Sequence, residues 1–487
     1  MPKDRTTIFT QALQLAANQR YEEADALVRQ SVAKPAKDAE GLALRGRLAI
    51  IAGKTAEARG HLEKSIKVAP SHEAYRLLAH YHLLMAEDEA AAVASQASID
   101  LDPGNPGPRI EHAAILIEVG RTDEAAETIA PAIDSSRLDE ALSRRLQITL
   151  ASIEIQQGDL EAAIARLDAV IAQDPPRMER HGALDLLAKA CDRSGLHDRA
   201  FEAAGLRNRE ADIKFDATSL TRHADSIIAN TDRDSLQRWP EGLDDPRPVF
   251  VAGMPRSGTS LVDRLIDAHP RAAGVGELPL LERFSERLSK ALRPGPPPGC
   301  FGELQEPAWK DGAAVALRQL EQQAGTEAER IVNKSLANDR LLGIASRLLP
   351  GCRVLHVIRD PRDVAVSCFL GRFQDHRLPW TTSLEGIATA WRESNRIMQH
   401  WKSVLDIPIL EVRYERLVTD PDHEFPRIIE FLGLDWDDDC RRFHEKSAPI
   451  RTLSFDQVNR PLYTSSISRH RNYLRHLEGI DWPSYDT

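Results

Sequence analysis

Residues 253–260 combine a glycine-bounded turn with guanidinium and hydroxyl side chains, which are the groups that bind anions. The stretch reads Gly-Met-Pro-Arg-Ser-Gly-Thr-Ser and follows the apolar residues 248–252. A strand that turns tightly into a helix directs backbone N–H groups and the positive end of the helix dipole toward one point. We therefore expect a phosphate-like anion to bind here; a strand-to-helix turn without a ligand is the alternative. The residues expected to hold the anion are Arg256, Ser257, Gly258, Thr259 and Ser260.

This turn lacks the lysine of ordinary nucleotide-binding loops. Gly253 and Gly258 enclose four residues, as in a Walker A loop, but Thr259 stands where that motif has its lysine. The substitution disfavours an ordinary ATP or GTP site. Arg256 would then supply the positive charge.

A second anion-binding pair is expected at Arg359 and Ser367. Residues 353–358 are apolar enough for a buried strand, which breaks into the charged turn 359–363. Arg359 leaves the end of the strand, and Ser367 lies two turns along the following helix, so both side chains would reach one phosphate. His356, within the strand, is expected in the core or behind the site rather than as a base.

A carboxylate and a lysine each follow a short apolar stretch. Glu277 comes after Gly274-Val275-Gly276, and Lys334 comes just after residues 330–333. Open α/β sheets bind ligands at the carboxyl ends of their strands, which would place both groups at the site. A solvated loop acid and a surface lysine are the alternative interpretations.

The stretch 458–473 is dense in hydroxyl and guanidinium groups, including Ser468 and Arg469. Such a segment suits closure over a polyanion, although a solvated tail has the same composition. Another expected strand, 407–415, carries an aromatic residue, Tyr414, at its end.

These residues require a parallel sheet flanked by helices, because strand-like and helical stretches alternate through the second half of the chain. We expect this α/β, P-loop-like domain to cover residues 248–487. A turn-rich linker is expected over 210–247, where Trp239-Pro240-Glu241-Gly242 interrupts the helical pattern.

The first 209 residues carry an internal repeat. A small residue recurs at intervals of 34, 33, 34, 38 and 37 residues, by subtraction, close to the tetratricopeptide period. The recurring residues are Ala24, Ala58, Ala91, Ala125, Ala163 and Ala200. Five residues before most of them stands a turn glycine, or Ala86 as a variant, and prolines follow several second helices. The pattern predicts an all-α tetratricopeptide solenoid of about six repeats over 1–209. Its concave face would bind a peptide or protein segment, or the array would serve self-association and scaffolding.

Composition bounds the class of protein. The net charge is −11 without a long basic run, which argues against nucleic acid as the main partner. Five scattered cysteines without a Cys-x-x-Cys pair are typical of reduced thiols, and we expect no zinc site or other metal. The chain has no apolar run as long as a membrane span and no signal-peptide pattern at its start. We therefore expect a cytoplasmic protein that has no membrane partner.

With these motifs in place, the stretch from about Pro248 to Leu477 resembles the sulfotransferases that use 3′-phosphoadenosine-5′-phosphosulfate (PAPS), in their tyrosylprotein sulfotransferase branch. Residues 255–260 are similar to that family's 5′-phosphosulfate loop, and Arg359 through Ser367 to its 3′-phosphate motif. A preceding tetratricopeptide array is a familiar arrangement in bacterial members of the family.

The resemblance implies a role for each matching residue. Glu277 would be the catalytic base, with Arg256, Lys334 and Ser468 stabilising the leaving group. Tyr414 would contact adenine, and Arg469 would lie beside Ser468 near the sulfonate bridge. The implied reaction moves a sulfuryl group from PAPS to an acceptor hydroxyl, such as a tyrosine of a peptide that the repeats present, without a metal cofactor.

The chain departs from the family's pattern in two places and leaves alternatives open. One additional residue separates His269 from Glu277, and Ser260 stands where a second threonine is usual. Animal enzymes of the branch are membrane-anchored and disulfide-bonded, unlike the expectation here, so the acceptor is alternatively a small molecule, lipid or saccharide. A P-loop-like kinase or a non-catalytic nucleotide-binding scaffold is the alternative of a different class.

Overall fold

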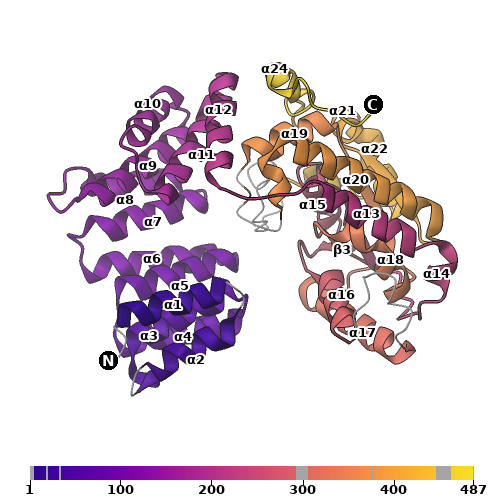
Figure 1. The fold of residues 1–487 in the computed structure, drawn as a ribbon, viewed down its shortest axis with the longest axis horizontal. Coiled ribbons are helices and arrows are strands. Elements are labelled where there is room, and N and C mark those ends of the chain that lie inside the picture. Colours follow the sequence, from indigo (N-terminus) through magenta and orange to yellow (C-terminus); the bar gives the residue numbers. More distant parts are fainter. Residues whose placement is uncertain are drawn as a thin grey trace. The chain divides into compact units, whose positions relative to one another are not determined.

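The computed structural model describes residues 5–17, 20–31, 34–291, 305–371, 373, 378–445 and 462–485. The chain divides into two compact units, Met1–Ala200 and Phe201–Thr487. Figure 1 shows helices throughout the first unit and a sheet with surrounding helices in the second. We call the first the repeat unit, and we call the second the catalytic unit because it carries the residues that the sequence predicts to be catalytic.

The repeat unit consists, over the described residues, of successive helix pairs whose members contact one another. The sixth pair ends at residues that group with the catalytic unit. The helices are α1 (Arg5–Ala17), α2 (Tyr21–Gln30), α3 (Ala39–Ile51), α4 (Thr55–Val68), α5 (His72–Leu84), α6 (Asp88–Leu101), α7 (Pro106–Glu118), α8 (Thr122–Ile133), α9 (Glu140–Gln157), α10 (Leu160–Ile171), α11 (Arg177–Arg193) and α12 (His197–Glu210), with a short 3-10 turn at Pro35–Lys37. This arrangement is the predicted helical solenoid.

The recurring small residues explain how the pairs pack. All six of the predicted alanines, from Ala24 to Ala200, are fully buried. The turn residues five positions earlier have left-handed backbone, with φ of 69° at Gly53 and 91° at Gly158. Ala86, at the equivalent turn, also has a positive φ, 59°. The repeat is therefore set by two local requirements: a small side chain where the helices cross, and a left-handed turn between them.

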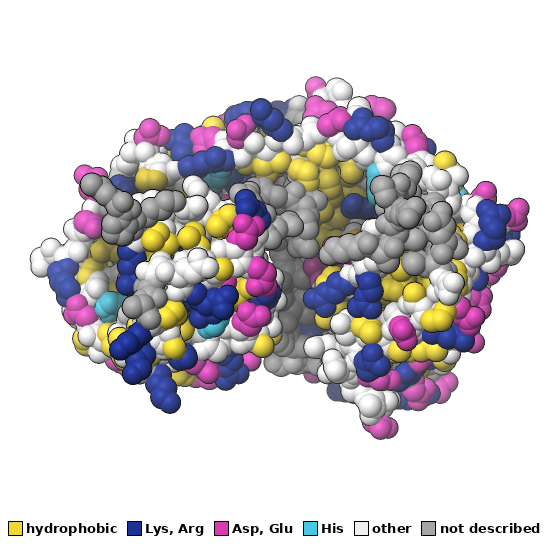
Figure 2. All heavy atoms as spheres, turned by 60° about the horizontal axis from the view of Figure 1, so that its bottom comes forward, with side chains coloured by type: hydrophobic (Ala, Val, Ile, Leu, Met, Phe, Trp, Pro, Cys, Tyr) yellow, Lys and Arg dark blue, Asp and Glu magenta, His cyan; other side chains and the backbone are white. Residues whose placement is uncertain are grey.

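Charged side chains of the repeat unit form exposed pairs at a recurrent position. Arg20 pairs with Glu23 at 2.6 Å, and Arg121 pairs with Glu124 at 2.5 Å at the equivalent turn. On the face drawn in Figure 2, basic and acidic side chains are interspersed. Exposed pairs of this kind contribute little to stability, because water and salt screen the charges.

The catalytic unit is built on a parallel sheet with the strand order β2-β3-β1-β4-β5. The strands are β1 (Pro248–Ala252), β2 (Ala272–Gly274), β3 (Arg330–Asn333), β4 (Arg353–Ile358) and β5 (Ile409–Arg413). The helices are α13 (Thr218–Asn230), α14 (Arg233–Gln237), α15 (Thr259–Asp267), α16 (Leu280–Ala291), α17 (Glu306–Ala324), α18 (Asn338–Leu348), α19 (Pro361–Leu370), α20 (Leu384–Val404), α21 (Tyr414–Thr419), α22 (Pro421–Phe431) and α24 (Leu474–Leu477). Short 3-10 turns span Pro379–Thr382, Asp438–Arg442 and Arg469–Tyr473.

Both faces of the sheet are covered, and β1 shows why its sequence is apolar throughout. Phe250 and Ala252 belong to one core cluster, while Val249 and Val251 belong to the other. A strand buried on both faces needs apolar residues at every position. Strands β2 and β3 lie on one side of β1, and strands β4 and β5 lie on the other. The strand order therefore reverses at β1, and open α/β sheets bind ligands at such a reversal.

Across the described residues, no helix combines the length and apolar character needed to span a membrane.

Candidate functional site

The turn between β1 and α15 is shaped by close contacts as well as by backbone conformation. Arg256 and Gly258 are both left-handed, with φ of 67° and 105°. A Cβ on Gly258 would lie only 2.4 Å from Cδ2 of Tyr414, so the position admits no side chain unless that ring moves. The predicted anion loop therefore packs directly against Tyr414, which follows β5 and begins α21.

Arg256 is joined to the second predicted anion pair. Its Nε donates a hydrogen bond of 2.8 Å to Oγ of Ser367 on α19. Burial lowers the pKa of Arg256 below its ordinary value, and the neighbouring charges of Arg359 and Arg469 lower it further. Positive charges gathered in a poorly solvated place favour an anion as their partner.

Arg359, which follows β4, lies beside the same loop. Its Nη1 donates to the backbone oxygen of Arg256 at 3.0 Å, and its guanidinium carbon lies 4.4 Å from the centre of the Tyr414 ring. The residue is only 6% exposed, and its Nε has no hydrogen-bond partner within the described part of the chain. A buried guanidinium N–H of this kind has the capacity to donate to a phosphate oxygen. We call Arg256, Arg359, Ser367 and Tyr414 the arginine cluster.

Helix α19, which carries Ser367, is held at both ends. Asp360 caps its start by accepting from the Arg362 amide at 2.8 Å. At its other end, Arg207, which lies in the catalytic unit, donates to the carbonyl oxygens of Phe369 and Gly371 at 2.9 and 3.1 Å. The helix therefore presents Ser367 from a fixed position.

Lys334 and Glu277 form a direct ion pair. Nζ of Lys334 lies 2.5 Å from Oε1 of Glu277, and the side chains are 3% and 43% exposed, respectively. The Lys334 amide also donates to the Gly276 carbonyl at 2.9 Å. Lys334 follows β3, the neighbour of β1, so the pair lies at the carboxyl edge of the sheet that also carries the arginine cluster. A half-exposed carboxylate beside a buried cation has the groups needed for proton transfer and charge stabilisation.

The remaining predicted residues support the loop. The Ser257 hydroxyl donates to the Met254 carbonyl at 2.7 Å and so braces the turn. Thr259 and Ser260 are buried in the first turn of α15. Ser468 directly precedes the 3-10 turn that begins at Arg469.

Two buried carboxylates, those of Asp263 and Asp363, were not predicted from the sequence. Asp263 on α15 is 2% exposed, burial raises its pKa to about 7, and its Oδ1 has no hydrogen-bond partner among the described residues. Asp363 on α19 contacts the segment around Ser468. Its place four residues after Arg359, on the same helix face as Ser367, was the available signal.

His356 lies in the interior of the sheet. It is 3% exposed, and burial lowers its pKa to about 3. Its Nδ1 lies 4.0 Å from Oε2 of Glu411. The imidazole is therefore neutral at ordinary pH.

Comparison with known proteins finds similarities in the second half of the chain. Residues 248–438 match the Sulfotransferase family. An uncharacterized protein of Aquifex aeolicus is 26% identical over 390 residues, covering 78% of this chain and 50% of that protein. A putative protein-tyrosine sulfotransferase of Caenorhabditis briggsae is 27% identical over 206 residues, covering 40% of this chain and 69% of that protein. The chain thus spans half the length of the Aquifex relative.

Among solved structures, the sulfotransferase domain from the Synechococcus PCC 7002 olefin synthase is similar, with 23% identity and a TM-score of 0.35. The match covers 51% of this chain and 93% of that domain.

Proposed function

Because residues 248–438 match the Sulfotransferase family, we propose that the protein transfers a sulfuryl group from PAPS to an acceptor hydroxyl. The observation that carries this proposal is the arginine cluster. Two guanidinium groups from different strand ends meet over one glycine turn, where Arg256 Nε lies 2.8 Å from Ser367 Oγ and Arg359 keeps a buried Nε without a protein partner in the described chain.

The cluster fits a bisphosphorylated nucleotide. Arg359 and Ser367 would hold the 3′-phosphate, and the residues from Arg256 to Ser260 the 5′-phosphosulfate. Tyr414, whose ring packs on Gly258, would contact the adenine, with Ser468 and Arg469 closing near the sulfonate bridge. When bound, PAPS would supply an activated sulfuryl group.

Glu277 would accept the proton of the acceptor hydroxyl as its oxygen forms the new bond to sulfur. The bond from sulfur to the 5′-phosphate oxygen breaks, and Lys334, Arg256 and Ser468 would stabilise the charge left there. The 2.5 Å contact with Lys334 holds the Glu277 carboxylate beside the cation that would stabilise the leaving group.

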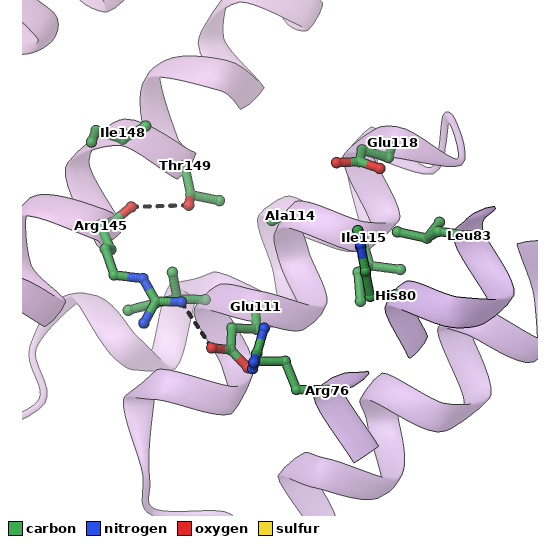
Figure 3. Close-up of a pocket in the computed structure, with 11 residues that line it drawn as sticks. Arg76, His80, Leu83, Glu111, Ala114, Ile115, Glu118, Arg145, Ile148 and Thr149 are labelled. Atoms are coloured by element: carbon green, nitrogen blue, oxygen red, sulfur yellow. Dashed lines mark hydrogen bonds and ion pairs between the residues drawn. The ribbon is translucent and has the colours of Figure 1, made fainter. Parts of the chain in front are cut away.

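We further propose that the acceptor is a peptide or protein side chain that the repeat unit binds. A pocket of about 300 Å3 lies in this unit among α5, α7 and α9. Figure 3 shows Arg76 and Arg145 beside Glu111, with Ala114, Ile115 and Ile148 among the apolar lining, and Nη2 of Arg145 lies 2.9 Å from Oε1 of Glu111. An apolar lining with an ion-paired rim suits a peptide side chain and its polar backbone.

The donor is tested by binding and by mass spectrometry. The protein is expected to bind 3′,5′-adenosine bisphosphate more tightly than ATP with Mg2+, and to add the mass of one SO3 group to an acceptor in the presence of PAPS. Preference for ATP with Mg2+, or phosphoryl transfer, would show a kinase instead.

The acceptor is tested by filling the pocket. Ala114 is exposed on α7, so Ala114→Phe is expected to leave the helix folded while occupying the pocket. Turnover on polypeptides should fall and turnover on a free phenol should not. Ala130→Phe, at an exposed position of α8 that does not line the pocket, is the matched control. Equal polypeptide turnover in both variants would favour a small-molecule acceptor.

A further inference from the structure

The carboxylate of Asp363 ties α19 to the segment that carries Ser468. Oδ2 accepts a hydrogen bond from the Ser468 amide at 2.8 Å. Oδ1 accepts from the His470 amide at 2.8 Å and lies 2.9 Å from Nδ1 of the same residue. The Asp363 side chain is 1% exposed, so these contacts replace water as its partners.

Asp363 is ionised in this setting. Burial favours the neutral acid, but the hydrogen bonds from His470 and the charge of Arg359 outweigh it and hold the pKa of Asp363 below its ordinary value. An ionised carboxylate only accepts hydrogen bonds, which matches the two backbone amides that point at it.

Ser468 needs such support because its backbone is left-handed, with φ 56° and ψ 22°. This conformation is unfavourable for a residue other than glycine, because its Cβ comes close to the following carbonyl oxygen. Asp363 binds the amide of Ser468 itself and the amide of His470, two residues later. The carboxylate therefore holds the peptide geometry that aims the Ser468 side chain.

The other end of the segment is tied to the arginine cluster. Arg359 donates through Nη2 to the Ser466 carbonyl, and the Tyr414 hydroxyl lies 2.7 Å from Oγ of Ser466. Residues 466–470 thus contact the arginine cluster at one end and Asp363 at the other.

From this geometry we propose that Asp363 is a positioning residue, which acts through Ser468 to set the hydroxyl that faces the leaving group. The inference rests on the proposed sulfuryl transfer. A hydroxyl displaced by about 1 Å from the reacting atoms loses much of its effect, up to roughly a hundredfold in rate. Asp363 would therefore affect turnover more than nucleotide affinity.

Asp360 is the matched control for a purely structural role. Like Asp363 it is buried at the start of α19, but its carboxylate contacts Arg362, with Oδ2 2.6 Å from Nη2, and not the segment 466–470. Asparagine serves as well as aspartate at the cap of a helix. Asp360→Asn is therefore expected to leave turnover nearly unchanged.

The test is a double-mutant cycle on the full chain with PAPS as donor. Asp363→Asn turns one acceptor into an N–H donor that faces an amide, so kcat should fall roughly ten- to a hundredfold while the donor KM changes little. Ser468→Ala should also lower kcat. If Asp363 acts through Ser468, the double variant should be no slower than Ser468→Ala alone. The proposal would be overturned if the losses of kcat in Asp363→Asn and Ser468→Ala multiplied in the double variant, or if Asp360→Asn lost as much kcat as Asp363→Asn.

Two further measurements keep the outcome clear. Asp363→Glu retains the charge and replaces Asp363→Asn in the cycle if the latter fails to fold. Hydrogen exchange at the Ser468 and His470 amides should be faster in the Asp363 variant than in wild type and unchanged in Asp360→Asn, a result that does not depend on activity. If the wild-type chain transfers no sulfuryl group, the proposed function fails. Unchanged exchange at these amides would instead refute the proposal that Asp363 holds Ser468 in place.

Discussion

Left-handed glycines occur in both units, but their surroundings differ. Around Gly158 of the repeat unit an added Cβ would meet nothing within 4 Å, whereas on Gly258 of the catalytic unit it would lie 2.4 Å from the Tyr414 ring. Both have a positive φ, of 91° and 105°. Gly158 is required only by the conformation of its own backbone. Gly258 is also required by its contact with Tyr414, which lies 156 positions away, by subtraction.

Charged side chains show the same difference. The repeat unit places its recurrent pairs on the surface, as at Arg121 and Glu124. The catalytic unit buries Lys334, Arg359 and Asp363 and gives each a specific partner. Repeat positions thus satisfy local rules that recur, while site positions depend on single long-range contacts. The comparison can be tested with paired substitutions.

The largest effect is expected at Glu277. Glu277→Gln removes the proposed base and should lower kcat by roughly 10²–10⁴-fold with little change in the donor KM. Glu154 of the repeat unit, which accepts from Arg166 at 2.6 Å, provides the control, because Glu154→Gln should leave kcat unchanged. Steady-state rates with PAPS decide between them. A Glu277 variant with wild-type kcat would remove this residue from the catalytic role.

Arg359→Ala should act on binding instead. Loss of charged hydrogen bonds to the 3′-phosphate is expected to raise the donor KM about ten- to a hundredfold, with a smaller effect on kcat. Calorimetry with 3′,5′-adenosine bisphosphate measures the affinity directly. A fall in kcat at constant KM would assign Arg359 to the chemical step.

Gly258→Ala and Gly158→Ala separate contact from conformation. Each adds about 1–2 kcal/mol of left-handed strain. Only the Gly258 variant must also displace Tyr414, so it alone should raise the donor KM, and its melting temperature should fall further. Circular dichroism compares the two melting temperatures, because all seven tryptophans lie from Trp239 to Trp482 and their fluorescence follows only the catalytic unit. Similar kinetics in the two variants would contradict the contact with Tyr414.

His356 should give the catalytic unit a pH-dependent stability. Its pKa of about 3 lies below the ordinary value of about 6.5, so between these values the unfolded chain binds the proton and the folded chain does not. The contribution of the neutral His356 to the free energy of unfolding is therefore fully present above pH 6.5, and it declines as the pH falls toward 3. His356→Leu should remove about 1.4 kcal/mol per pH unit from this slope in urea titrations followed by tryptophan fluorescence. An unchanged slope would show that His356 is protonated when folded.

The smallest effect is expected at Ala86, which stands in a turn of the repeat unit where the equivalent positions Gly53, Gly120, Gly158 and Gly195 are glycine. Its φ of 59° favours glycine, so Ala86→Gly should stabilise the unit by about 0.5–1 kcal/mol after the entropy that glycine adds to the unfolded chain. Ala52, a helix end with φ −82°, is the matched control, and Ala52→Gly should destabilise. Thermal unfolding followed by circular dichroism distinguishes the two, and PAPS turnover should be unaffected in both.

Features that depend on neighbours in the chain could be predicted from the sequence. The alanine and glycine phases predicted the helix pairs, because packing at a crossing and φ at a turn are local requirements that a periodic pattern records. The continuous apolar run of β1, followed by the turn to Ser260, likewise predicted a buried parallel strand that enters a helix. The eight-residue spacing of Arg359 and Ser367, which spans a strand end and two helical turns, predicted that both would reach one phosphate, and in the structure each of them contacts Arg256.

Other features of the site needed the tertiary structure. Glu277 alone is indistinguishable from a solvated loop acid, and only the pairing of β2 with β3 brings Lys334 within 2.5 Å of it. Asp363 meets Ser468 across 105 residues, and Gly258 after β1 meets Tyr414 after β5, although β4 lies between these two strands in the sheet. No spacing rule links such positions, because the order of strands in a sheet follows from how the helices cover both of its faces. The sequence by itself determined which elements form and which groups can hold an anion, whereas the tertiary structure decided which of those groups meet.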